Sequence, residues 1–201
     1  NKKRIYIFTG FGVIGIIVFV ILYFTIFTGG KSGKIKSPEQ CNLLVITLDT
    51  TRADYIGAYG AATASTPNID KLAADGILFE HCSTSVPITL PSHCSIFTGQ
   101  YPLAHQVRDN GTFFLGPQST TMAEKMKESG KQTYAVIAAY ILLAKFGLNQ
   151  GFDLYDDSLN VDELIKNLDS EIDAAQVYSK FSAWLKGQSS TPFFAWVHFY
   201  D

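Results

Sequence analysis

The stretch NLLVITLD, Asn42–Asp49, decides the fold of this chain. It is a continuous apolar run closed by a carboxylate, and the absence of alternation is typical of a strand buried on both faces of a parallel α/β sheet. A second apolar run, PFFAWVHFY, covers Pro192–Tyr200 and predicts another buried strand. Gln132–Ala138 and Ile77–Cys82 are further strand candidates.

Helical segments alternate with these strands, and Pro and Gly mark their ends. The predicted helices are Asn68–Ala74, Pro91–Phe97, Ser119–Ser129 (with Ser119 or Thr120 as its cap) and Glu171–Leu185. Strands that alternate with helices predict an α/β layered fold.

The composition is that of a globular protein with a core. Of the 201 residues, 47% are hydrophobic and 17% are charged, so the chain is not of the disordered class. The formal net charge is −2, and no basic stripe occurs beyond the first few dozen residues. We therefore expect no nucleic-acid partner.

A stretch near the start is predicted to cross a membrane. Ile5–Thr28 carries no charge, and about 24 helical residues span roughly 36 Å, enough for a hydrocarbon core of about 30 Å. A secretory signal has a shorter apolar region and a small-residue cleavage site, so we predict an uncleaved anchor. The expected organisation is a basic flank at 1–4, an anchor at 5–28, a Gly-, Ser- and Lys-rich linker at 29–40 and a globular part at 41–201.

The three cysteines, Cys41, Cys82 and Cys94, have no metal-ligand spacing. Cys82 and Cys94 could pair in an oxidising compartment, or they could be small buried thiols. The cysteines therefore do not decide the compartment.

Asp49 and Thr89 are the first candidates for chemistry. Asp49 lies at the carboxyl end of the first strand, where open α/β sheets bind ligands, and could hold a hard cation or simply cap the following turn. Thr89 precedes the Pro91 helix, whose positive end favours an anion. Its hydroxyl could be a metal-activated nucleophile or only a helix cap.

Three further residues are candidates for contacts with a substrate. His93 lies four residues after Thr89, so it could assist proton transfer or bind a substrate oxygen, and a structural histidine is the alternative. Arg52 and Asn110 could contact anionic oxygens, although an arginine such as Arg52 is more often a surface charge.

Several motifs, in order, resemble the amino-terminal half of a sulfatase of the alkaline phosphatase superfamily. They are NLLVITLDTTRADYIGAYG from Asn42, STPNIDKLAADGILFEHC from Ser65, VPITLPSHCSIFTGQYPLAHQVRDNG from Val86, GLNQGFDLYDD (Gly147–Asp157) and PFFAWVHFYD (Pro192–Asp201). The resemblance implies an α/β sandwich around a mixed sheet, incomplete in this chain, with one or two divalent cations beside a nucleophile at a helix start. By position, Asp49 matches the first metal-binding carboxylate and Thr89 the nucleophile, which also contacts the metal.

The chain departs from the sulfatase pattern at three positions. Sulfatases carry a Cys or Ser that is oxidised to formylglycine where this chain has Thr89, and an Arg where it has His93. The second carboxylate of the usual Asp pair is replaced by Thr50, which weakens an all-oxygen calcium cage. A Thr nucleophile instead resembles phosphoethanolamine transferases, lipoteichoic-acid synthases and nucleotide pyrophosphatases, in which a Zn- or Mn-like cation stabilises the developing charge.

These observations predict a membrane-anchored, metal-dependent hydrolase or transferase that acts on phosphate or sulfate esters through Thr89. We expect Zn, Mn or Mg rather than Ca, and a small-molecule, lipid or glycan ester as substrate. The alternative is a catalytically inactive sulfatase-like domain that serves as a binding module or scaffold.

The last strand is followed at once by the end of the sequence, so we expect a piece of a longer protein that is inactive alone.

Positive charges flank the predicted anchor on both sides and nearly balance. The resemblance therefore decides the expected orientation, a single-pass membrane protein with its catalytic domain outside the cytoplasm.

Overall fold

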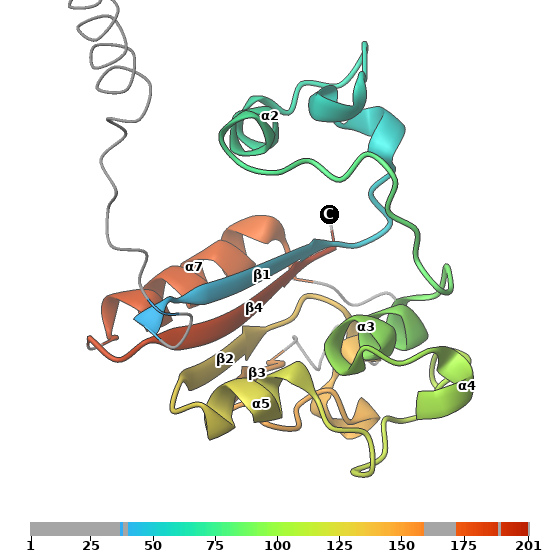
Figure 1. Cartoon of the computed structure of the whole chain (residues 1–201), viewed down its shortest axis with the longest axis vertical. Helices are drawn as coiled ribbons and strands as arrows, with labels where there is room; N and C mark the ends of the chain where they lie inside the picture. Colours follow the sequence, from blue (N-terminus) through green and yellow to red (C-terminus); the bar gives the residue numbers. More distant parts are fainter. Residues whose placement is uncertain (1–36, 38–39, 159–171, 189, 201) are drawn as a thin grey trace, which may run out of the picture. The chain divides into compact units, whose positions relative to one another are not determined.

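The computed structural model describes residue 37 and residues 40–158, 172–188 and 190–200. The chain divides into two compact units, residues 1–37 and 38–201. The second unit contains a four-stranded sheet with strand order β1-β4-β2-β3, in which all described pairings are parallel (Figure 1). The strands are β1 (Leu43–Leu48), β2 (Gln132–Val136), β3 (Leu154–Asp156) and β4 (Phe193–Phe199).

Helices cover both faces of this sheet. The α-helices are α2 (Pro67–Asp75), α3 (Thr89–Thr98), α4 (Pro102–His105), α5 (Met122–Glu128) and α7 (Ala174–Lys186). Short 3-10 helices are η2 (Ala53–Tyr55), η3 (Gly57–Tyr59), η4 (Tyr140–Leu142) and η5 (Ala144–Phe146). Helix α7 lies on one face of the sheet, and α3 and α5 lie on the other (Figure 1).

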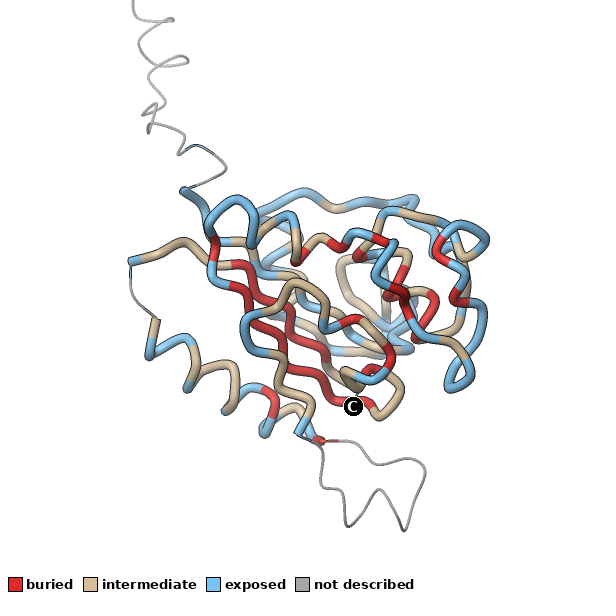
Figure 2. The backbone as a smooth tube through the Cα atoms, turned by 90° about the horizontal axis from the view of Figure 1, so that it is seen from below, coloured by how far each residue is buried: buried red, intermediate tan, exposed pale blue. Residues whose placement is uncertain are grey.

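Aromatic contacts attach the helices to the central strands. On the α7 face, Trp184 stacks on Tyr134 of β2 with ring centroids 4.4 Å apart and planes 11° apart. On the α3 face, Phe97 contacts Trp196 of β4 at 4.5 Å. Each such pair contributes about 0.5–1.5 kcal/mol beyond its area burial. The buried residues concentrate in β2, β4 and the segments packed on them (Figure 2).

Most predicted elements are confirmed. Strands β1, β2 and β4 and helices α2, α3 and α7 all lie where the sequence placed them, with bounds shifted by up to three residues. The mixed sheet that the resemblance implies is parallel throughout the part of the chain that the structure describes.

The predicted strand Ile77–Cys82 is wrong, because this segment is irregular. Ile77 is 83% exposed and Phe79 is 69% exposed, so the apolar side chains on which the prediction rested do not pack on a sheet. Strand β3 is not among the predicted elements, because three residues are too few to give a periodic pattern.

The predicted cap of α5 is also wrong. The helix begins at Met122 and its cap is Thr121, not Ser119 or Thr120. Thr121 Oγ1 accepts the N–H of Glu124 at 3.1 Å, and the Glu124 carboxylate accepts the N–H of Thr121 at 2.7 Å. This capping box satisfies two backbone donors at the helix start. The Thr121 hydroxyl also donates to the carbonyl of Gln150 at 2.9 Å.

Two other expectations concern the anchor and the cysteines. None of the helices in the described residues is long and apolar enough to cross a membrane, and the predicted anchor at 5–28 lies outside those residues. Cys82 and Cys94 do not form a disulfide, and of the three cysteines only Cys94 is buried.

The cap provides a test of the fold. Thr121→Ala removes one side of the capping box and the bond to Gln150, so we expect the free energy of unfolding to fall by about 1–2 kcal/mol in urea denaturation. Thr120→Ala is the matched control, because Thr120 is exposed and does not cap the helix, and it should change stability by less than about 0.5 kcal/mol. Equal losses in the two variants would contradict the assignment of the cap.

Candidate functional site

Asp49 directly follows β1 and is fixed by the neighbouring strand. Its N–H donates to the carbonyl of Phe199 at 2.9 Å, which extends the β1–β4 pairing by one bond. The next residue, Thr50, has a φ of 52°, in the left-handed region. A β-branched residue is rarely found there, and such strain of about 1–3 kcal/mol concentrates at functional sites. The backbone turns sharply immediately after the Asp49 carboxylate.

The Asp49 side chain contacts His198 of β4. Oδ2 of Asp49 lies 3.2 Å from Nε2 of His198, and the two side chains are 8% and 0% exposed. Burial raises the pKa of Asp49, but the hydrogen bond from His198 and a hydrogen bond from the backbone of Thr50 lower it, and the pKa lies below its usual value. Asp49 is therefore a carboxylate at neutral pH.

Thr89 is the first residue of α3, which begins two residues before the predicted start at Pro91, and the helix cap is Ile88. The helix ends at Gly99, which has a φ of 67° and donates its N–H to the carbonyl of Ser95. At the helix start, Asn110 Oδ1 accepts the N–H of Leu90 at 3.0 Å. The N–H of Ser92 goes to the Ile88 carbonyl, and Pro91 has none. Few backbone donors of this first turn therefore remain for an anion.

His93 lies one turn further along α3 and is 5% exposed. Its Nδ1 is 2.8 Å from the carbonyl oxygen of Thr89. Because a carbonyl only accepts, Nδ1 carries the proton and Nε2 presents a lone pair. Nε2 is buried without a hydrogen-bond partner. Burial, together with the nearby His198, lowers the pKa of His93 to about 4, so its ring is neutral at neutral pH.

The side chains of Asp49, Thr89 and His93 line one pocket of about 450 Å³. It lies between the carboxyl end of β1, the segment that precedes α3, and the first turns of α3. Its other lining residues are Thr47, Leu48, Thr50, Thr51, Thr84, Val86, Pro87, Ile88, Ser92 and Ile96. The structure thus brings together three of the five predicted site residues.

The remaining two predicted residues do not line this pocket. Arg52 donates to both carboxylate oxygens of Asp54 at 2.9 and 2.6 Å on an exposed surface. Asn110 uses its side-chain oxygen to hold the start of α3. In this structure, Asn110 positions the helix and Arg52 pairs with a neighbour in the sequence.

His198 is the site residue that sequence reasoning missed. The run PFFAWVHFY predicts a strand, and a histidine near the carboxyl end of such an apolar strand is the signal that could have marked His198 as a site residue. The register of β1 against β4, in which Thr47 is opposite His198, is what brings it to Asp49. That register could not be read from either strand alone.

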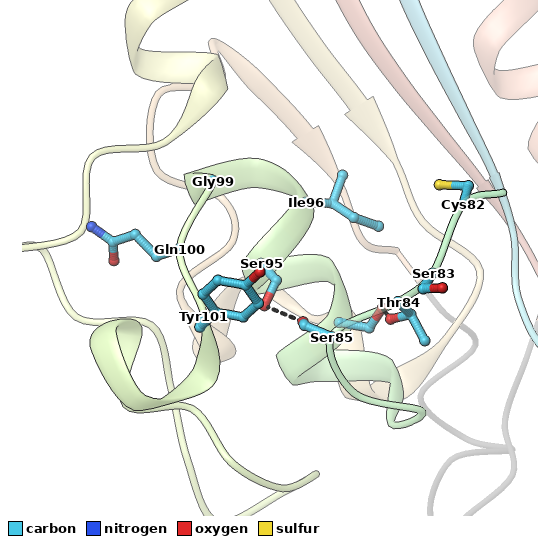
Figure 3. A pocket seen from close by; sticks show the side chains of 10 residues that line it. Cys82, Ser83, Thr84, Ser85, Ser95, Ile96, Gly99, Gln100 and Tyr101 are labelled. Carbon is cyan, nitrogen blue, oxygen red and sulfur yellow. Dashed lines mark hydrogen bonds between the residues drawn. The ribbon is translucent and has the colours of Figure 1, made fainter. Parts of the chain in front are cut away.

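Figure 3 shows the residues that line a second pocket, of about 420 Å³. It shares Thr84, Ser92 and Ile96 with the first, so the two adjoin. Here Ser95 lies 3.0 Å from Nε2 of the buried His105. The N–H of Val107 donates to Nδ1 of this histidine, so Nε2 carries the proton and donates to Ser95. In this tautomer His105 cannot take a proton from Ser95, and the pair is not a serine–histidine nucleophile.

The donors in the first pocket are compatible with a divalent cation. The Asp49 carboxylate and the Thr89 hydroxyl are oxygen ligands, which suit a divalent cation such as Mg or Mn. Within the described part of the chain, no group of three or more His, Cys, Asp or Glu side chains is arranged to hold a metal ion. Asp49 and its neighbours therefore fit part of a ligand set.

The chain is similar to known sulfatases. The family model for sulfatases matches residues 41–201. An N-acetylglucosamine-6-O-sulfatase of Bacteroides thetaiotaomicron is 30% identical over 57% of this chain and 20% of its own length. The ulvan-active sulfatase of Formosa agariphila is 25% identical over 86% of this chain and 27% of its own length. The chain thus spans about a quarter or less of the length of these relatives.

Solved structures share the fold. The phosphonate monoester hydrolase of Agrobacterium radiobacter matches with a TM-score of 0.64 and 21% identity, over 80% of this chain and 40% of that protein. A protein solved with its substrate D-glucosamine-2-N,6-O-disulfate matches with a TM-score of 0.67 and 20% identity, over 79% of this chain and 34% of that protein.

The unpartnered nitrogen of His93 gives a testable prediction about stability. A buried polar atom without a partner costs about 1–3 kcal/mol, so His93→Leu should change the free energy of unfolding of the metal-free protein by less than about 1 kcal/mol. The lost bond to the Thr89 carbonyl is minor, because that carbonyl lies within the helix ladder. His105→Leu is the control: both of its nitrogens are bonded, and we expect a loss of about 2–3 kcal/mol. A larger loss for His93→Leu than for His105→Leu would contradict this view of the site.

Proposed function

Because this chain belongs to the sulfatase family, we propose that it takes part in the metal-dependent hydrolysis or transfer of sulfate or phosphate esters, with Thr89 as nucleophile. The observation that supports the proposal is that Asp49, Thr89 and His93 all line the same pocket. The carboxylate, the hydroxyl and the unpartnered imidazole nitrogen supply a cation ligand, a nucleophile and a proton acceptor. These groups are the ones that ester cleavage needs.

In the proposed reaction the Thr89 oxygen forms a bond to the sulfur or phosphorus of the ester. The bond from that atom to the leaving oxygen breaks, and the group remains on Thr89 until water or another acceptor removes it. The hydroxyl proton must leave as this bond forms. Thr89 keeps its hydroxyl as such, in contrast to the oxidised Cys or Ser of the sulfatase pattern.

His93 is the group that we assign to the proton. Donation from Nδ1 to the Thr89 carbonyl fixes the ring, which leaves the Nε2 lone pair without a partner on a residue that lines the pocket. A neutral imidazole accepts a proton but does not bind an anionic oxygen as a cation would. Of the two roles expected for His93, the geometry favours proton transfer. Loss of a general base costs about 10²–10⁴-fold, so His93→Leu should lower kcat by that factor while retaining stability.

Asp49 and Thr89 would hold the divalent cation, which supplies charge stabilisation when bound. The Asp49 carboxylate is ionised, and its Oδ2 accepts a hydrogen bond from His198. The backbone of Asp49 is held as well, because its N–H donates to the Phe199 carbonyl. Such an arrangement keeps the ligand oxygen in position before the cation binds.

The substrate class rests on the relatives. Their names specify sulfated sugars and ulvan, and one protein of similar fold is a phosphonate monoester hydrolase. We propose an ester of a glycan, lipid or small molecule. Arg52 and Asn110 remain predicted substrate contacts, although neither lines the pocket around Thr89.

The nucleophile is tested by Thr89→Ala in the full-length protein, assayed on an aryl sulfate and on an aryl phosphodiester. Removal of a nucleophile costs about 10⁴-fold or more in kcat, and we expect a loss of this size on whichever ester the wild type cleaves. Thr89→Ser, which keeps a hydroxyl, should retain measurable turnover.

The matched control is Thr98→Ala, at the other end of the same helix. The Thr98 hydroxyl donates to the Cys94 carbonyl at 2.6 Å, and its side chain does not line the pocket. This variant should keep its activity within about twofold. A substitution at this end of the helix can change the stability of the protein, but it removes no group from the pocket. Undiminished turnover by Thr89→Ala would refute the assignment, and a wild type inactive on both esters with Mn²⁺ or Zn²⁺ present would favour the inactive scaffold.

We further propose that residues 5–28 anchor the protein in a membrane, with the domain at 41–201 outside the cytoplasm. The support is the charge-free apolar sequence of this stretch. The full-length protein should stay in the membrane pellet after an alkaline carbonate wash, and deletion of residues 1–36 should release it. Deletion of residues 1–4 alone, the control, should not. A carbonate-soluble wild type, or a domain protected from protease added outside intact cells, would contradict the proposal.

A further inference from the structure

His198 is a fully buried polar residue within the sheet. It lies near the carboxyl end of β4, it is 0% exposed, and its neighbours in the strand are the apolar residues Val197 and Phe199. Desolvation of an imidazole has a cost that packing of an apolar residue would avoid. Its presence at this position therefore requires partners for both of its nitrogens.

Both nitrogens have partners, and the partners fix the tautomer. The N–H of Ala138, just after β2, donates to Nδ1 of His198 at 3.3 Å. Nδ1 therefore accepts, so Nε2 carries the proton and donates to Oδ2 of Asp49 at 3.2 Å. A neutral ring makes both bonds. The chain of contacts runs from Ala138 through His198 to Asp49 and connects the carboxyl ends of β2, β4 and β1.

The two bonds have separable consequences. The bond from Ala138 stabilises the fold, because it satisfies a buried backbone N–H that would otherwise lack an acceptor. The bond to Asp49 holds one oxygen of the carboxylate that lines the pocket beside Thr89. Partners that orient a metal ligand in this way typically change metal affinity by about 10–100-fold when they are removed.

We propose that His198 is a positioning residue that holds the Asp49 carboxylate in the orientation needed to bind a divalent cation. The inference rests on the proposed function, in which Asp49 is a cation ligand. His198 itself touches neither the substrate nor the cation. Its contribution is the fixed direction of Asp49, shared with the backbone bond from the Asp49 N–H to Phe199.

Two substitutions separate positioning from a structural role. In His198→Asn the side chain can still accept from Ala138, but it is too short to reach Asp49. In His198→Gln the longer amide can donate to Asp49 in place of Nε2, but the acceptor for Ala138 is lost. We expect His198→Asn to keep the thermal midpoint near that of the wild type and to lose about 10–100-fold in cation affinity. The Gln variant should show the reverse, with affinity within about fivefold of the wild type and a lower midpoint.

The measurement is a titration of the metal-free full-length protein with Mn²⁺, in which electron paramagnetic resonance follows the free ion. Mn²⁺ is preferred to Zn²⁺ because the exposed thiols of Cys41 and Cys82 would bind the softer ion. Affinities that follow the thermal midpoints across the two variants would overturn the proposal, since a purely structural role predicts that pattern. An unchanged affinity in His198→Asn would overturn it as well.

A double-mutant cycle distinguishes this inference from the proposed function. Asp49→Asn should lower Mn²⁺ affinity, and adding His198→Asn to it should lower the affinity no further, because the two residues act through one carboxylate. Normal affinity in Asp49→Asn contradicts the cation role of Asp49 and, with it, the proposal for His198. Lost affinity in Asp49→Asn together with additive losses in the double variant contradicts the role of His198 alone.

Discussion

The parallel pairing of β1 with β4 is the constraint on which the site depends. The register runs from Leu43 opposite Phe194 to Leu48 opposite Phe199. It places Asp49 against His198, although 149 residues separate them in the sequence. The carboxyl ends of parallel strands meet at one edge of the sheet, so both residues reach the same crevice. A register shift of one residue would turn His198 to the opposite face and leave Asp49 without this partner.

The same strand pair also positions the helix that carries Thr89. Trp196 of β4 donates its ring N–H to Thr47 of β1 at 3.0 Å, and its ring contacts Phe97 and His93 of α3 at 4.5 and 5.5 Å. Phe97 and Trp196 are both buried, at 2% and 0% exposure. Helix α3 is therefore docked on the strands that end at the pocket, which explains how a helix and two strands distant in sequence converge on one site.

Much of the fold follows from the sequence, because the apolar runs at Asn42–Asp49 and Pro192–Tyr200 become β1 and β4. Pro91 and Gly99 likewise mark a helix that the structure contains. The failures have physical causes. Local hydrophobicity suggested a strand at Ile77–Cys82, but only tertiary packing determines whether such side chains find a surface.

The site was predictable only in part, for a related reason. Asp49 and Thr89 could be found because each lies at the end of an element, a position that local sequence reveals. The contact of Asp49 with His198 depends on the strand order β1-β4-β2-β3, which no single segment encodes. The same holds for Asn110, whose bond to the Leu90 N–H spans 20 residues. Pairwise geometry between distant segments is what sequence reasoning lacked.

Some residues of the pocket adopt conformations or environments that cost free energy, and this bears on whether the domain is an enzyme or a scaffold. Thr50 is held at a φ of 52°, and His93 keeps a buried nitrogen without a partner. Each costs on the order of 1–3 kcal/mol, against a net stability of about 5–15 kcal/mol for a typical domain. Both residues line the same pocket as Asp49. A domain that only binds a partner gains nothing from these costs, whereas the proposed ester cleavage uses a fixed carboxylate, a hydroxyl nucleophile and an imidazole nitrogen that can accept a proton. Their coincidence at one pocket therefore favours the enzyme.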